Sequence, residues 1–64
     1  MIHTLRGLGS EHEKIQIEEI EDEQRVVITC IDGDTEQSVE LDLDKLHSLI
    51  GVLLHVQAKL KNRR

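Results

Sequence analysis

The sequence predicts an α+β fold in which a three-stranded antiparallel sheet packs on one long C-terminal helix, in the order β-β-β-α, with the N-terminal arm as a candidate fourth strand. Three observations lead to this prediction. Polar and apolar residues alternate before residue 42, which is the pattern of a strand with one buried face. Asp32-Gly33 is a strong short-range turn signal. After Asp42 the apolar spacing changes to three and four residues, the spacing of one helix face.

The first strand is expected at 13–20, where Ile15 and Ile17 alternate with polar residues. Residues 1–12 lack periodicity and include two glycines, so we interpret them as a flexible arm or an edge strand. Residues 13–64 then form a single small domain. The polar residues 21–24 suit a hairpin loop.

The second strand is expected at 25–31, where five of the seven residues are β-branched. Its apolar residues fall on both faces, so it is predicted to be the central strand, covered on both sides, with Cys30 in the core. The third strand follows at 36–41. A two-residue turn at Asp32-Gly33 would place Val26 opposite Val39, but the loop length, and with it the register, stays open.

The helix is expected at about 43–61, interrupted only by Gly51. Asp42 or Asp44 can cap its first turn by accepting a backbone N–H. The apolar residues cover an arc of roughly 200°, about twice what a one-sided surface helix needs. One side of this arc can therefore cover the sheet, while the side around Leu49, Val52 and Val56 would be exposed in a monomer.

An exposed aliphatic strip on a helix normally marks an interface, and small chains without disulfides often gain stability by oligomerising. We therefore predict a homo-oligomer, with a dimer as the first hypothesis. Gln57 lies within the apolar stripe, either fixing the register of a helix pair or reaching water from the last turns. The predicted self-interface consists of Leu46, Leu49, Ile50, Val52, Leu53, Val56 and Leu60.

Length and composition exclude several classes of protein. The 64 residues contain no aromatic residue and one cysteine, which excludes a multi-domain enzyme and a disulfide-knotted domain. The longest apolar run is far shorter than the roughly 20 residues of a membrane span, so no membrane partner is expected. The expected localisation is cytoplasmic, since residues 1–10 do not resemble a signal peptide.

Neither catalysis nor metal binding is expected. His47 and His55 lie eight residues apart, about 12 Å along a helix, so they cannot share a metal within one chain. Ser10 and Ser48 lack the context of an activated nucleophile. We therefore predict no catalytic residues, no metal ligands and no cofactor.

Charge is distributed unevenly. The thirteen acidic residues all lie between Glu11 and Asp44, where only Lys14 and Arg25 oppose them, so that segment carries a net charge of −11. The predicted acidic partner surface consists of Glu18, Glu19, Glu21, Asp22, Glu23, Asp32, Asp34, Glu36 and Glu40. Four of the last six residues are basic and none is acidic, and the candidate phosphate contacts are Lys59, Lys61, Arg63 and Arg64.

These patterns predict a small non-enzymatic interaction or regulatory protein of bacterial or phage type, which self-associates through its helix and presents an acidic surface to a basic protein partner. A first alternative is an inhibitor that mimics phosphate groups and blocks a nucleic-acid-binding protein. In size and charge the chain is broadly similar to small acidic inhibitors of phages and mobile elements. A second alternative is a weak DNA-binding dimer that uses the basic C-terminal tail, although the net charge of −5 disfavours nucleic acid.

Overall fold

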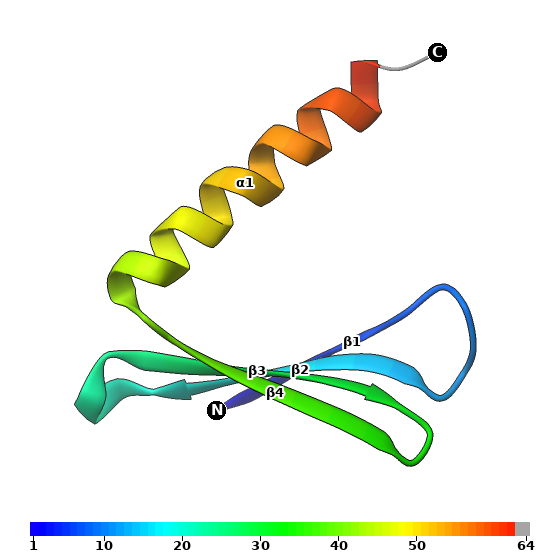
Figure 1. The fold of residues 1–64 in the computed structure, drawn as a ribbon, viewed down its shortest axis with the longest axis horizontal. Helices are drawn as coiled ribbons and strands as arrows, with labels where there is room; N and C mark the ends of the chain where they lie inside the picture. The colour runs from blue at the N-terminus through cyan, green and yellow to red at the C-terminus, as the bar shows by residue number, and fades with distance from the viewer. Residues whose placement is uncertain (63–64) are drawn as a thin grey trace.

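A computed structural model describes residues 1–62 and shows a four-stranded antiparallel sheet followed by one long helix (Figure 1). The predicted α+β fold is confirmed, including the fourth strand from the N-terminal arm. The elements are β1 (Ile2–Arg6), β2 (Glu13–Ile20), the 3-10 turn η1 (Glu21–Glu23), β3 (Arg25–Asp32), β4 (Thr35–Asp42) and α1 (Leu43–Asn62).

The strands form a meander, in the order β1-β2-β3-β4, so each strand pairs with its neighbour in the chain. The β3–β4 turn is centred on Gly33 and Asp34, because Asp32 pairs with Thr35. Gly33 has a φ of 62°, a conformation that costs glycine nothing. Val26 therefore pairs with Leu41. This register differs by two residues from the one that an Asp32-Gly33 turn would impose, and it keeps each side chain on the same face.

The β1–β2 connection is held by Glu13. The backbone N–H of Gly7 donates to the carbonyl oxygen of Glu13 at 2.8 Å, and the N–H of Gly9 donates to its Oε1 at 3.2 Å. A Cβ atom on Gly7 would collide with the Glu13 side chain. The two glycines that suggested a flexible arm therefore allow a close loop that places β1 on the edge of the sheet.

Alternation divides the sheet into two faces of different character. The strand register puts one set of apolar side chains on a common side. This apolar face contains Leu5, Ile15, Ile17, Val26, Ile28, Cys30, Val39 and Leu41. The opposite, polar face mixes charged and hydroxyl side chains with Ile2, Ile20, Val27 and Ile31. On it, Thr29 Oγ1 and Ser38 Oγ are 2.9 Å apart and share a hydrogen bond.

Helix α1 contacts the sheet only where the helix begins. It touches β3 and β4, and Leu46 and Leu49 are half-buried while every helix residue from Ile50 to Asn62 is exposed. Val26, on the apolar face, is 6% exposed and is the only buried apolar side chain in residues 1–62. Beyond these first turns the helix rises away from the strands (Figure 1).

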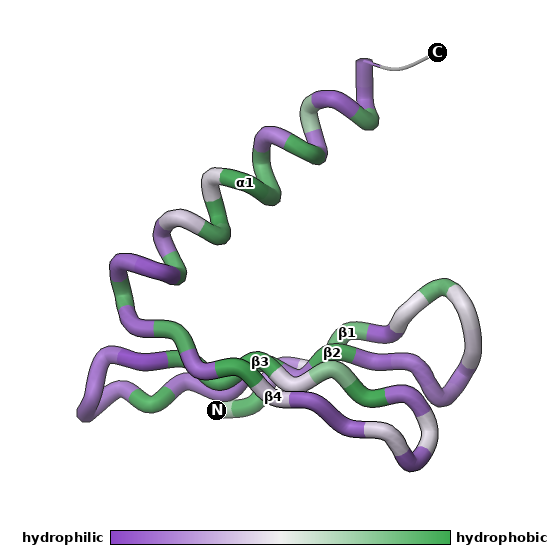
Figure 2. Tube along the Cα trace, viewed as in Figure 1, coloured by the Kyte–Doolittle hydropathy of each residue, from purple (hydrophilic) through white to green (hydrophobic). Residues whose placement is uncertain are grey.

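Because the helix leaves the sheet, the molecule is less compact than a typical domain of its length. Its radius of gyration is 13.6 Å, against about 11 Å for a compact chain of this length. Its accessible surface is 5814 Å², against about 4,200 Å² for a compact monomer of this mass, an excess of roughly 1,600 Å². Hydrophobic residues recur along the whole length of α1 (Figure 2), although only its base meets the sheet.

Candidate interaction surfaces

The first candidate surface is a stripe on α1. Residues at successive three- and four-residue steps lie on one side of a helix, and here that side is the one on which the base of α1 meets the sheet. We call Leu46, Leu49, Leu53, Val56 and Leu60 the helix stripe. Leu46 and Leu49 are half-buried, whereas Val56 is 43% and Leu60 65% exposed. Leu49, expected on the uncovered side, therefore faces the sheet, and Ile50 and Val52 flank the stripe.

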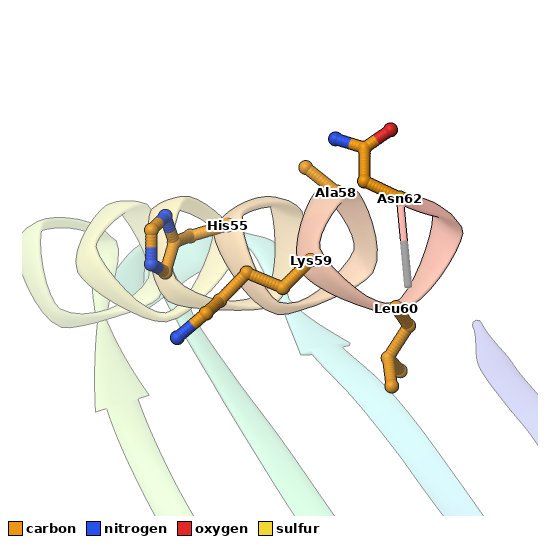
Figure 3. Close-up of a pocket in the computed structure, with 5 residues that line it drawn as sticks. All are labelled: His55, Ala58, Lys59, Leu60 and Asn62. Atoms are coloured by element: carbon orange, nitrogen blue, oxygen red, sulfur yellow. The ribbon is translucent and has the colours of Figure 1, made fainter. Parts of the chain in front are cut away.

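A hollow of about 530 Å³ follows the distal half of α1 (Figure 3). It is lined by His55, Ala58, Lys59, Leu60 and Asn62. Leu60 points to the side of the helix on which the strands lie, and Ala58 points away from them (Figure 3). Because all five lining residues come from one helix, no second element encloses a small ligand. This hollow is therefore an open surface of the distal helix and not a ligand pocket.

The second candidate surface is the far end of the apolar face. A hollow of about 350 Å³ lies there, and Ile15 and Cys30 are among its lining residues. Glu13, Asp32 and Gln37 also line it. Cys30 is exposed, so its expected place in the core is wrong for the single chain. Sequence patterns missed this surface because they indicate which side chains share a face and not whether anything covers that face.

The nine acidic residues predicted as a partner surface do not lie on one face. Glu18 and Glu40 flank Val27 on the polar face, and η1 adjoins them at the same end of the sheet. We call Glu18, Glu21, Asp22, Glu23 and Glu40 the acidic end. The other four are dispersed: Glu19 and Asp32 are on the apolar face, Glu36 is at the far end of the polar face, and Asp34 is in a turn.

Arg25 organises the acidic end. Its guanidinium Nη1 donates to Oε2 of Glu40 at 2.9 Å and its Nη2 forms an ion pair with Glu23. These pairs link η1 to β4 and neutralise part of the local charge. Glu18, Glu21 and Asp22 remain exposed beside them, and these three carboxylates can attract a basic protein.

An ion pair crosses from β1 to β2 on the apolar side. His3 Nε2 and Glu19 Oε1 are 2.8 Å apart. The hydrogen bond from the His3 imidazole lowers the pKa of Glu19 below the usual carboxyl value. Electrostatic attraction by His3 and by the N-terminal amine lowers the pKa further. Both side chains are about half exposed, so the pair ties the N-terminal strand to the sheet and does not form an enclosed acid–base site.

The remaining candidates are the basic residues near the C-terminus and the possible metal ligands. Lys59 and Lys61 lie in the last turn of α1, while Arg63 and Arg64 lie outside the described residues. Among residues 1–62, no three histidine, cysteine or acidic side chains come together in a group that could hold a metal ion.

Within the described part of the chain, α1 is too polar to cross a bilayer. Comparison with protein-family models, with curated proteins and with solved structures finds no match to this chain.

Proposed function

We propose that this chain is a non-enzymatic interaction module that self-associates through α1 and offers its acidic end to a protein partner with a basic surface. The observation that carries the proposal is the helix stripe, which is half-buried at Leu46 and Leu49 and open from Leu53 to Leu60. An aliphatic stripe of this kind is costly to leave in water.

The surface area supports self-association. The excess of roughly 1,600 Å² over a compact monomer lies within the range of about 1,000–2,500 Å² that each partner buries in an obligate dimer. The single buried apolar side chain of residues 1–62, Val26, is also too small a core to stabilise a domain on its own. Association of two copies would bury the apolar surface that the single chain leaves exposed.

The experiment is a measurement of mass by sedimentation equilibrium and light scattering, over about 1 to 200 μM protein at low and high salt. We expect a multiple of 7.3 kDa that salt does not dissociate, because aliphatic contacts are not screened. A monomer at every concentration would reject the self-association.

The acidic end is tested separately, by partner capture on immobilised protein. A variant carrying Glu18→Gln, Glu21→Gln and Asp22→Asn should lose a basic partner that wild type retains. The matched control carries Asp34→Asn and Glu36→Gln at the other end of the sheet, and it should retain that partner. Equal retention by both variants would mean that the acidic end serves solubility only.

The other two predicted functions, phosphate mimicry and DNA binding through the basic tail, stay predictions. The acids are divided among separate groups, and neither function gains a specific observation from residues 1–62.

A further inference from the structure

We infer that the apolar face of the sheet is covered by α1 of a second copy of the chain, so that two chains exchange their helices reciprocally. This inference rests on the proposed self-association and assigns its geometry. A pairing of helix with helix would cover the helix stripe but would leave the sheet exposed. Helix exchange covers both surfaces in one step.

Beyond the base of α1, the apolar face is uncovered within its own chain. Leu5 is 58% and Val39 54% exposed, and Ile15 is also exposed. Leu5 lies on β1, Val39 on β4 and Ile15 on β2, and all three are on the same side of the sheet as Val26. A face of this size left in water is destabilising, at about 25 cal/mol for each Å² of apolar surface.

The junction between β4 and α1 keeps the chain's own helix from covering this face. β4 ends at Asp42 and α1 begins at Leu43, with no intervening loop. Asp42 Oδ1 accepts a hydrogen bond from the backbone N–H of Lys45 at 2.8 Å, which caps the first turn. The helix then runs unbroken to Asn62. A connection too short to fold back favours exchange between copies over closure within one chain.

The helix and the sheet match in length. Twenty residues of α1 extend about 30 Å, and eight residues of β3 extend about 26 Å. The base of α1 already lies at Val26, which is 6% exposed, so the part of the face open to a second copy is its far end, around Ile15 and Cys30. The part of the stripe that is free is the distal one, from Leu53 to Leu60. A partner helix that seats its distal stripe on this far end brings Val56 over Cys30.

Opposite charges also meet in this placement. In this placement the last turn of α1, which carries Lys59 and Lys61, reaches the end of the sheet that carries Glu13 and Asp32. Opposite charges would then meet at the rim of the hollow around Ile15 and Cys30.

The test uses Cys30 as a native reporter. Full-length V56C is purified reduced, and isotopically heavy and light chains are mixed, unfolded, refolded together and oxidised with glutathione disulfide. We expect most of the chain to form a covalent dimer, because facing positions bring the Cα atoms within the few ångströms that a disulfide requires. After trypsin, peptide 26–45 should be linked to peptide 46–59, in heavy–light hybrids as well as in uniform pairs.

The matched control is A58C, since Ala58 lies on the opposite side of α1 from the helix stripe (Figure 3). It should not link to Cys30. A second variant, C30S/V56C, reports helix pairing, because its thiols can link only to each other.

Linkage of two copies of peptide 46–59, or a dimer with no link in either variant, would overturn helix exchange while leaving self-association standing. A link between positions 30 and 56 without heavy–light hybrids would place the helix on its own sheet and also overturn the inference. A monomeric wild type would reject the proposed function itself.

Discussion

Asp42 is both the last residue of β4 and the cap of α1: its Oδ1 accepts the backbone N–H of Lys45 at 2.8 Å. The first turn of a helix leaves backbone N–H groups without partners inside the helix, and here a strand residue supplies one of the missing acceptors. Sheet and helix are therefore joined by a capped turn with no loop between them.

Replacing this cap should weaken the joint. We expect Asp42→Ala to lower the free energy of unfolding by about 1 kcal/mol, because the N–H of Lys45 loses its side-chain acceptor. Asp44→Ala is the control, and it should lose only about 0.3–0.5 kcal/mol of favourable interaction with the helix dipole. Urea unfolding followed by circular dichroism at equal protein concentration measures both. Equal losses would argue that the cap contributes nothing beyond charge.

A charge placed in the helix stripe should disrupt association. Val56→Glu removes apolar burial and forces a carboxylate into an apolar contact, so we expect an association at least about 100-fold weaker, corresponding to about 2.7 kcal/mol. Leu49→Glu, closer to the base of the helix, should act in the same direction. Ala58→Glu, on the opposite side, should leave the mass unchanged. Sedimentation equilibrium measures all three, and a wild-type mass for Val56→Glu would reject the stripe as an interface.

The same substitution should have opposite effects at two glycines. Gly33 has a φ of 62°, so Gly33→Ala should destabilise the fold by about 1 kcal/mol. Gly51 lies within α1, with open space around its Cβ position, so Gly51→Ala should stabilise the fold by about 1 kcal/mol. Thermal and urea unfolding provide the comparison. A loss of stability at Gly51 would show that an unseen contact occupies that side of the helix.

The His3–Glu19 pair should be visible in a carboxyl titration. The folded pKa of Glu19 is lowered by the hydrogen bond from His3, so the pair's stabilisation is present above the ordinary carboxyl pKa and is lost as the pH falls through the lowered value. In His3→Ala the pKa of Glu19 should return towards its usual range. Carbon-detected NMR of the glutamate carboxyl groups measures the shift. His12→Ala is the control and should leave Glu19 unchanged.

The strands and the helix were predictable because local patterns determine them. Ile15 and Ile17 identify β2, the β-branched run from Val26 identifies β3, and the spacing that begins at Leu43 identifies α1. The turn residues alone do not determine the β3–β4 register, since Asp32-Gly33 and Gly33-Asp34 are both acceptable turns. The register also depends on which side chains pair across the two strands. Pairing Val26 with Leu41 and Ile28 with Val39 places apolar residues together across the strands.

The surfaces were harder to predict. Helix periodicity identified the apolar arc of α1, but it does not give the direction in which α1 leaves the sheet. That direction decides that Leu49 faces the sheet while Val56 does not meet it. Cys30 has the pattern of a core residue, and its exposure follows from the position of the helix and not from its neighbours in the sequence. The acidic residues share a segment but not a face, because alternation separates Glu18 from Glu19.

The order β1-β2-β3-β4 leaves two outer strands, each with a row of backbone donors and acceptors on its free side. Such edges can add strands from other molecules and grow into continuous sheets. β4 carries Glu36 and Glu40 on its exposed length, and stacking copies of that strand edge to edge would bring like charges together. The fold thus discourages open-ended growth along its β4 edge, and it leaves the faces of the sheet for the proposed contact between two copies.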